Sequence, residues 1–250
     1  AISLIAKRQT PHMGPVLPRL SVWNVKTEQK TFKAKRGGDK PSLFAFFILI
    51  KGRRKAKKLN YIEEIKNYLP ADEQEQADKE TILKYISLFS DNILTRENIF
   101  AHITGSAIIL NKTADKTLMV YHNIYKSWSW TGGHADGAKD VFTLAAQEAK
   151  EETGIKNIAP LNDGRLASID VLPVWGHFKK NKYVSSHLHL SLAYLFEADE
   201  SEVLSAKLDE NSGVKWIKID EITQYVSEPD MLPVYKKLFN RAVKNVLSAK

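Results

Sequence analysis

A glycine pair followed by a short helix with clustered glutamates is the feature that most constrains this chain. The segment is residues 132–155, GGHADGAKDVFTLAAQEAKEETGI. Its part 141–153 is predicted to be a helix, and Gly154 suits the left-handed conformation that ends many helices. Helical residues three and four positions apart share a face, so three carboxylates gather within about 6 Å of one another. These are Glu148, Glu151 and Glu152.

The clustered carboxylates need compensating positive charge, because three like charges on one face repel one another. A hard cation such as Mg²⁺ binds oxygen ligands and often shares them with substrate phosphates. Upstream, Gly132 and Gly133 let the backbone approach a ligand, and the start of the following helix offers free amides to phosphate oxygens. The segment therefore predicts a site for a metal ion and a phosphate. The alternative for the acidic stretch alone is a solvated helix face, helped by Lys150.

The full spacing of the segment favours the metal site, because it resembles the signature of the Nudix hydrolase family. That signature is G-x5-E-x7-R-E-U-x-E-E-x-G-U, in which U is an aliphatic residue, and Ala149 matches it weakly. The clear matches are Gly133, Glu148, Glu151, Glu152, Gly154 and Ile155. The Trp-Ser-Trp-Thr-Gly-Gly lead-in, the preceding hairpin and a later strand at 214–216 also look like this family. The resemblance covers about residues 98–240.

Two positions depart from the signature. Lys139 stands where the family has Glu, and Gln147 where it has Arg. The resemblance implies that those two family residues brace the loop against the helix. Losing both leaves no stranded charge, but Gln147 lacks a cationic fork for the glutamates. Asp140 is a candidate to replace part of the missing carboxylate, and we expect activity to survive with some weakening.

The resemblance implies an α/β/α sandwich with a mixed β-sheet, preceded by short N-terminal helices. The order of strand-like and helical stretches also favours a mixed α/β domain. Helices are expected at 61–69, from 75 to about 89, at 141–153, at 221–226 and at about 232–247. Strands are expected at 101–110, 117–122, 166–174, 186–196 and 214–219. The expected domains are a helical segment at 59–97 and a Nudix hydrolase domain at 98–250.

The resemblance also implies an activity, which is Mg²⁺-dependent hydrolysis of a diphosphate linkage in a nucleoside diphosphate derivative, with Mn²⁺ as the alternative metal. The implied metal ligands are Glu148, Glu151, Glu152 and the carbonyl of Gly133. One glutamate, Glu148 or Glu151, orients or deprotonates the attacking water. Many relatives draw a further acidic ligand from a later loop. The candidates here are Glu200, Glu202, Asp209 and Glu210.

Residues around the glycine pair are candidates for contact with the substrate. Gly132 and His134 are placed to touch phosphate, although an ordinary loop role is the alternative for His134. Trp130 and Trp128 offer faces for stacking on a base, but aromatic residues in such a position more often pack beneath the loop.

His187 and His189 lie two apart on a predicted strand, and hence on one face. A zinc site needs further ligands, and no third ligand is evident from the sequence. Lining a pocket, or hydrogen bonding within the sheet, is therefore the preferred interpretation of this pair. The hydrophilic connection FKKNKY at 178–183 is expected to be a solvated hairpin tip rather than a contact for an anionic substrate.

Basic charge is concentrated near the start of the chain. Residues 1–60 hold 15 Lys and Arg against 2 Asp and Glu, whereas residues 61–250 hold 22 against 27. The overall net charge of +8 therefore does not indicate a nucleic-acid-binding domain. We expect residues 1–58 to be a peripheral or disordered extension; the alternative is an arm for RNA or an anionic membrane. The apolar run 43–50 is shorter than the about 20 residues of a membrane span, but suits a homodimer contact.

Two rival functions stay open. An isomerase of the same superfamily, acting on an isoprenoid diphosphate, would need a catalytic cysteine, and the chain has none. A catalytically weak or inactive Nudix-like module that binds a nucleotide or RNA is favoured by Lys139, Gln147 and the basic arm. The lack of cysteine also fits a reducing compartment, and we expect a cytoplasmic protein.

Overall fold

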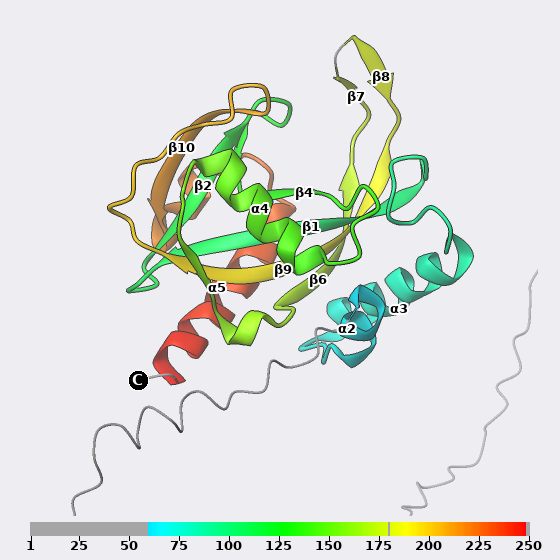
Figure 1. The fold of residues 1–250 in the computed structure, drawn as a ribbon, viewed down its shortest axis with the longest axis horizontal. Helices are drawn as coiled ribbons and strands as arrows, with labels where there is room; N and C mark the ends of the chain where they lie inside the picture. Colours follow the sequence, from blue (N-terminus) through cyan, green and yellow to red (C-terminus); the bar gives the residue numbers. More distant parts are fainter. Residues whose placement is uncertain (1–59, 180, 249–250) are drawn as a thin grey trace, which may run out of the picture. The chain divides into compact units, whose positions relative to one another are not determined.

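An eight-stranded mixed β-sheet forms the centre of the computed structural model, which describes residues 60–179 and 181–248 (Figure 1). Its strands are β1 (Ala101–Asn111), β2 (Lys116–His122), β3 (Ser127–Ser129), β4 (Thr131–His134), β5 (Ile158–Pro160), β6 (Ser168–Val174), β9 (His187–Ala198) and β10 (Asn211–Lys218). The order along the sheet is β10, β2, β1, β9 and β5, while β3 pairs with β2, β4 with β1, and β6 with β9. β1 runs parallel to β9, and the other pairs are antiparallel.

Helices cover both faces of this sheet. They are α2 (Tyr61–Asn67), α3 (Glu73–Leu88), α4 (Val141–Thr153) and α5 (Met231–Ser248), with short 3-10 helices η1 (Asn162–Gly164) and η2 (Ile219–Gln224). Residues of α2, α3 and α4 share one apolar core with the sheet, and residues of α5 and η2 share a second core on the opposite face (Figure 1). The predicted α/β/α sandwich is confirmed.

Among the described helices, we find none with the length and apolar character needed to cross a membrane.

The two central strands bury both of their faces, because helices lie on each side of the sheet. In β1, Ile103 and Ile109 enter the core beneath α4, whereas Ile108 and Leu110 enter the core beneath α5. Alternate residues of a strand point to the same face. His102 therefore lies on the same side of the sheet as Ile108, which is the side that α5 covers farther along the strand.

A buried group of charges joins α3, α5 and β6. The side chain of Glu75 has no exposed surface, and the guanidinium of Arg241 donates to its two oxygens at 2.6 and 2.9 Å. The ammonium of Lys237 lies 3.0 Å from Glu75 and donates to Asp170 at 2.6 Å. Burial on its own would raise the pKa of Glu75, but hydrogen bonds from Arg241, the amide of Ala71 and Lys237 lower the pKa to about 2.

Several boundaries differ from those expected. α2 ends at Asn67 instead of 69, and Tyr68 is already extended, close to Pro70. A proline restricts the residue before it to extended conformations, which favours an early end. The expected helix at 221–226 is the 3-10 helix η2, which begins at Ile219.

Five short strands were missing from the sequence prediction, because three or four residues carry too little alternation to be recognised. These are β3, β4, β5 and the hairpin strands β7 (His177–Lys179) and β8 (Lys182–Val184). The β7–β8 hairpin projects beyond the sheet, with Phe178 and Tyr183 exposed (Figure 1). This agrees with the expected hairpin tip.

The expected extension at 1–58, with its apolar run 43–50, lies outside the described residues. The boundary expected between 59–97 and 98–250 stays a prediction. Both α2 and α3 contribute to the same apolar core as α4.

Candidate active site

Helix α4 carries the three predicted carboxylates, and local sequence determines both of its ends. The carboxylate of Asp140 accepts hydrogen bonds from the amide and the hydroxyl of Thr143, at 3.0 and 2.8 Å, and so caps the first turn. Gly154 ends the helix with φ of +74°, a left-handed conformation that glycine adopts without strain. The predicted helix is confirmed, and Asp140, the candidate substitute carboxylate, serves as its N-cap.

Two of the glutamates turn toward the glycine pair of β4. The amide of Gly132 donates to Oε1 of Glu152 at 3.0 Å. A Cβ atom on Gly133 would lie 2.5 Å from Oε1 of Glu148, and one on Gly132 would lie 2.6 Å from the carbonyl oxygen of Gly105. Close approach to the backbone of β1 therefore requires glycine at 132, whereas a side chain at 133 would displace Glu148.

The carboxylates differ in their surroundings. Burial, together with the nearby Glu148 and Glu210, raises the pKa of Glu152 to about 8, although the Gly132 amide acts in the opposite direction. Burial also raises the pKa of Glu148. Glu151 is 60% exposed. Burial and crowding make it unfavourable for these carboxylates to ionise without positive charge nearby. A divalent cation would supply that charge, so the residues fit a hard metal ion such as Mg²⁺.

Two of the four later acidic candidates lie near the carboxylates of α4. Asp209 and Glu210 line the same cavity as Glu148. The ammonium of Lys207 lies 2.8 Å from Glu210 and 3.6 Å from Glu151, and so connects this loop to α4.

The other two candidates have partners elsewhere. Glu200 forms an ion pair with Lys116 at 2.8 Å. Glu202 accepts hydrogen bonds from the amides of Lys156 and Asn157, at 2.8 and 3.4 Å. These contacts hold the loop after β9 against its neighbours and do not direct either carboxylate to the glycine pair.

A cavity of about 970 Å³ opens beside the glycine pair. Binding sites for small molecules commonly have volumes of about 300 to 1,000 Å³. All three residues expected to contact the substrate line this cavity: Gly132, His134 and Trp130. The geometry is therefore that of a ligand site with carboxylates at one wall.

The two tryptophans of the lead-in have different positions. Trp128 packs edge-on against Tyr121, with ring centroids 5.6 Å apart, and the ammonium of Lys215 lies 4.6 Å from its ring. Trp130 lines the cavity and meets Tyr235 edge-on at 5.5 Å. Trp128 thus packs against β2 and β10, whereas Trp130 lines the cavity.

The loop between β4 and α4 is held by contacts that the sequence did not reveal. Lys139 and Gln147, at the positions that depart from the signature, are both exposed. In the same loop as Lys139, Asp136 accepts two hydrogen bonds from the guanidinium of Arg96, of which the one from Nε measures 2.9 Å. The amide of Gly137 adds a bond to the carbonyl of residue 94 at 2.9 Å. Arg96 lies 40 residues before Asp136, so no local pattern connects the two.

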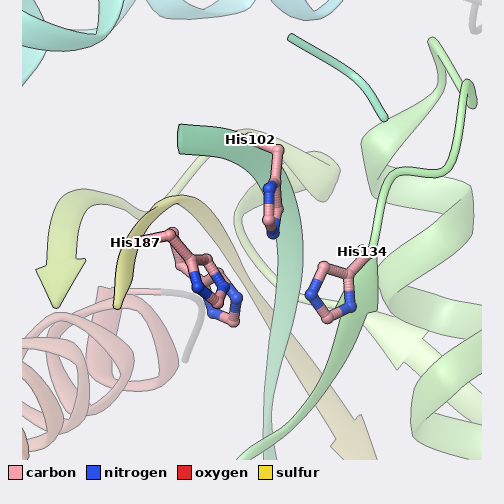
Figure 2. Close-up of side chains that lie close together, drawn as sticks. His102, His134 and His187 are labelled. Carbon is pink, nitrogen blue, oxygen red and sulfur yellow. The ribbon is translucent and has the colours of Figure 1, made fainter. Parts of the chain in front are cut away.

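Four histidines meet in the wall of the cavity. His187 and His189 of β9 are joined by His102 of β1 and His134 of β4. The rings of His102, His134 and His187 point toward one another (Figure 2). The ring centroid of His102 lies 4.9 Å from those of His134 and His187, and 5.3 Å from that of His189. Burial lowers the pKa of His134 to about 3, and it also lowers the pKa of His102 and of His189.

Comparison with known families decides the assignment. The family described as NUDIX domain matches residues 101–240, which is more than half of the chain. The chain belongs to the Nudix hydrolase family. This Nudix protein is a hydrolase that acts on phosphoanhydride bonds.

The match between this Nudix chain and its relatives spans most of the length of each relative. A probable DHNTP pyrophosphohydrolase of Lactococcus lactis subsp. cremoris is 29% identical over 59% of this chain and 83% of the relative. An RNA pyrophosphohydrolase of Pelagibacter ubique is 29% identical over 56% of this chain and 90% of the relative. Among solved structures, an Ap4A hydrolase of C. elegans is 17% identical, with a TM-score of 0.43, over 57% of this chain and 98% of the other.

Sequence reasoning on this Nudix domain missed His102 as a member of the histidine group. His102 stands near the start of a predicted strand, and only the pairing of β1 with β9, which places it beside His189, brings the two together. For His134, the sequence indicates a phosphate contact or an ordinary loop role, and neither connects it to the other histidines. The signal that could have found the group is the presence of three strand-borne histidines on one face, once the register is known.

Proposed function

We propose that this protein is a Mg²⁺-dependent pyrophosphohydrolase that cleaves a diphosphate linkage in a nucleoside diphosphate derivative. The observation that supports it most is the contact between α4 and the glycine pair. Glu152 accepts the amide of Gly132 at 3.0 Å, and Glu148 fills the space that a side chain on Gly133 would occupy. These contacts hold two carboxylates at the wall of a cavity of about 970 Å³.

The carboxylates of α4 are the proposed metal ligands. Glu148, Glu151, Glu152 and the carbonyl of Gly133 would hold Mg²⁺, or Mn²⁺ in its place. When bound, such an ion neutralises phosphate charge and polarises the phosphorus–oxygen bonds of the phosphate that the water attacks. Glu210, on the loop that Lys207 connects to α4, is the favoured further acidic ligand.

The protein's own groups position the water and the substrate. Glu148 or Glu151 orients the attacking water and accepts its proton. Gly132 contacts the phosphates, and Trp130 lines the cavity where a base would stack. His134, the other phosphate candidate, turns its ring into the group of four histidines. The names of the two relatives, both pyrophosphohydrolases, agree with this class of reaction. A homodimer and a cytoplasmic location stay predictions.

The experiment incubates the full chain with Mg²⁺ and a panel of nucleoside diphosphate derivatives, and follows the release of phosphate products. Turnover of at least one compound is expected. Glu152→Gln and Glu151→Gln should each lower kcat/KM by more than about 100-fold, since each removes a charge from the metal site. Glu80→Gln, an exposed glutamate on α3, is the matched control and should keep full activity.

Saturable binding of these compounds without turnover of any of them would overturn the hydrolase proposal in favour of a binding module. Turnover that is unchanged in Glu152→Gln and Glu151→Gln would instead overturn the assignment of the site. Circular dichroism of each variant separates a loss of chemistry from a loss of folding.

A further inference from the structure

We propose that a group of four histidines in the wall of the cavity binds a divalent transition-metal ion of the Zn²⁺ type. The group, called here the histidine cluster, is made of His102, His134, His187 and His189. This site is distinct from the carboxylates of α4, and the inference does not depend on the proposed hydrolysis.

Three strands bring the ligands together. His102 of β1 is the register partner of His189 of β9, and His187 precedes it on the same face of that strand. His134 comes from β4, which pairs with β1 on its other side. One nitrogen from each ring lies within 4.8 Å of one nitrogen from every other ring. Strands are rigid supports, so this convergence is built into the sheet.

Hydrogen bonds leave free ring nitrogens at the centre of the cluster. Nδ1 of His102 lies 3.1 Å from the carbonyl oxygen of Asn98, and Nδ1 of His187 lies 2.8 Å from that of Ser185. A ring that donates from Nδ1 to a carbonyl keeps the lone pair of Nε2 available, as metal-binding histidines commonly do. Among the described residues, the buried Nε2 atoms of His102 and His189 have no hydrogen-bond partner.

The unpartnered nitrogens argue against the simpler interpretation. Histidines that merely support a sheet satisfy their buried polar atoms, because an orphaned buried nitrogen costs about 1 to 3 kcal/mol. Protonating the rings does not remove this cost, because positive charges on neighbouring imidazoles would repel one another. A metal ion satisfies the inward-facing lone pairs at once.

The all-nitrogen donor set selects the metal class. Imidazoles suit Zn²⁺, Cu²⁺, Ni²⁺ and Fe²⁺, whereas Mg²⁺ requires oxygen ligands. In a tetrahedral zinc site with bonds of about 2.0 Å, the ligand nitrogens are about 3.3 Å apart. The ligand nitrogens here lie within 4.8 Å of one another, so side-chain rotations that move each ring by roughly 1 Å close the cluster around an ion.

A bound ion would also support the active site. His134 follows Gly133 directly, and Gly133 is the residue against which Glu148 packs. An ion shared by β1, β4 and β9 therefore anchors the strand that carries the glycine pair. Loss of the ion should loosen this strand even in the absence of any substrate.

The test measures Zn²⁺ binding to the full chain without an affinity tag, by competition with a chromophoric chelator in the presence of excess Mg²⁺. The wild type should bind one Zn²⁺ per chain, and Co²⁺ in its place should show the intense visible absorption of tetrahedral nitrogen coordination. The double substitution His187→Gln and His189→Gln should weaken binding by more than about 100-fold. Zn²⁺ should raise the Tm of the wild type and leave that of the double variant unchanged.

Two controls define the site. His177→Gln changes a histidine that lines the same cavity outside the cluster, and its Zn²⁺ affinity should equal that of the wild type. The double substitution Glu151→Gln and Glu152→Gln removes the carboxylate site, and Zn²⁺ binding should again persist. If the histidine double variant does not fold, His187→Gln alone and the imidazole nitrogen NMR signals of the wild type replace it, with four of the seven histidines expected to shift.

Absence of Zn²⁺ binding to the wild type would overturn the proposal. Binding that survives substitution in the histidine cluster, or that is lost in the glutamate variant, would overturn it equally, because the ion would then sit elsewhere.

Discussion

Gly133 is the residue at which the active-site geometry is most sensitive to a small change. A methyl group there would lie 2.5 Å from Oε1 and 2.8 Å from Cγ of Glu148. The carboxylate end can rotate away, so we expect Gly133→Ala to fold, with Glu148 displaced from its place beside the glycine pair. A displacement of about 1 Å in a catalytic group lowers activity by roughly 10- to 100-fold. Steady-state kinetics with Mg²⁺ measures the loss.

Gly137→Asn is the matched control for that substitution. Gly137 lies in the same loop, and no heavy atom comes within 4 Å of the Cβ position. Its φ of +90° is tolerated better by asparagine than by other side chains. Activity close to that of the wild type is expected in this variant, and equal losses in both would show that any change in the loop is harmful.

The sequence predicts the relative positions of site residues only where those residues belong to one helix. The spacing of Glu148 and Glu152 follows from helical geometry, which places both on the face toward the glycine pair, whereas Glu151 stays 60% exposed. The histidine cluster could not be predicted in this way, because the neighbour of His102 across the sheet depends on the register between β1 and β9. That register is determined by packing of the whole sheet.

Helix α4 is the element on which the site depends, and its N-cap gives a direct test. Asp140→Ala removes the acceptor for the Thr143 amide and should lower the free energy of unfolding by about 1 kcal/mol. Asp140→Asn keeps a side-chain acceptor and should restore nearly all of that stability. Urea unfolding in the presence of EDTA measures both.

The same pair of variants distinguishes the two roles considered for Asp140, which are capping of α4 and replacement of the missing family carboxylate. If Asp140 replaced a missing family carboxylate, asparagine would restore stability but not activity. We expect Asp140→Asn to keep both, since the carboxylate is already engaged with Thr143 through two hydrogen bonds.

Long elements were predicted well and short ones poorly. α4 and the pair β1–β2 carry enough periodicity to be recognised, and their boundaries differ from the expected ones by at most one residue. β4 has four residues, two of which are glycines, so neither alternation nor propensity identifies it as a strand. It is nevertheless the strand that presents the glycine pair, because pairing with β1 compensates for its weak local preference.

At the scale of the whole molecule, the buried charges around Glu75 connect α3 to α5. The two helices belong to the separate apolar cores on opposite faces of the sheet. Breaking a buried ion pair by removing one partner costs about 3 to 5 kcal/mol, because the remaining charge is left uncompensated. Glu75→Gln leaves Arg241 and Lys237 facing a neutral amide, and we expect a loss of about 3 kcal/mol.

The pH dependence of stability identifies the ionised carboxylate as the cause of that loss. The pKa of Glu75 is about 2 in the folded protein, against an ordinary value of 4.5 in the unfolded chain, so the unfolded state binds the proton more readily. The stabilisation is therefore complete above about pH 4.5 and disappears as the pH falls toward 2. At 1.36 kcal/mol for each pH unit, the contribution is about 3 kcal/mol.

Urea unfolding of wild type and Glu75→Gln in EDTA, from pH 7 downward, should show two curves of unfolding free energy that converge between pH 4.5 and 2. Glu80→Gln on the exposed face of α3 should follow the wild type throughout. A difference between wild type and Glu75→Gln that stays constant with pH would mean that packing, and not charge, joins the two helices.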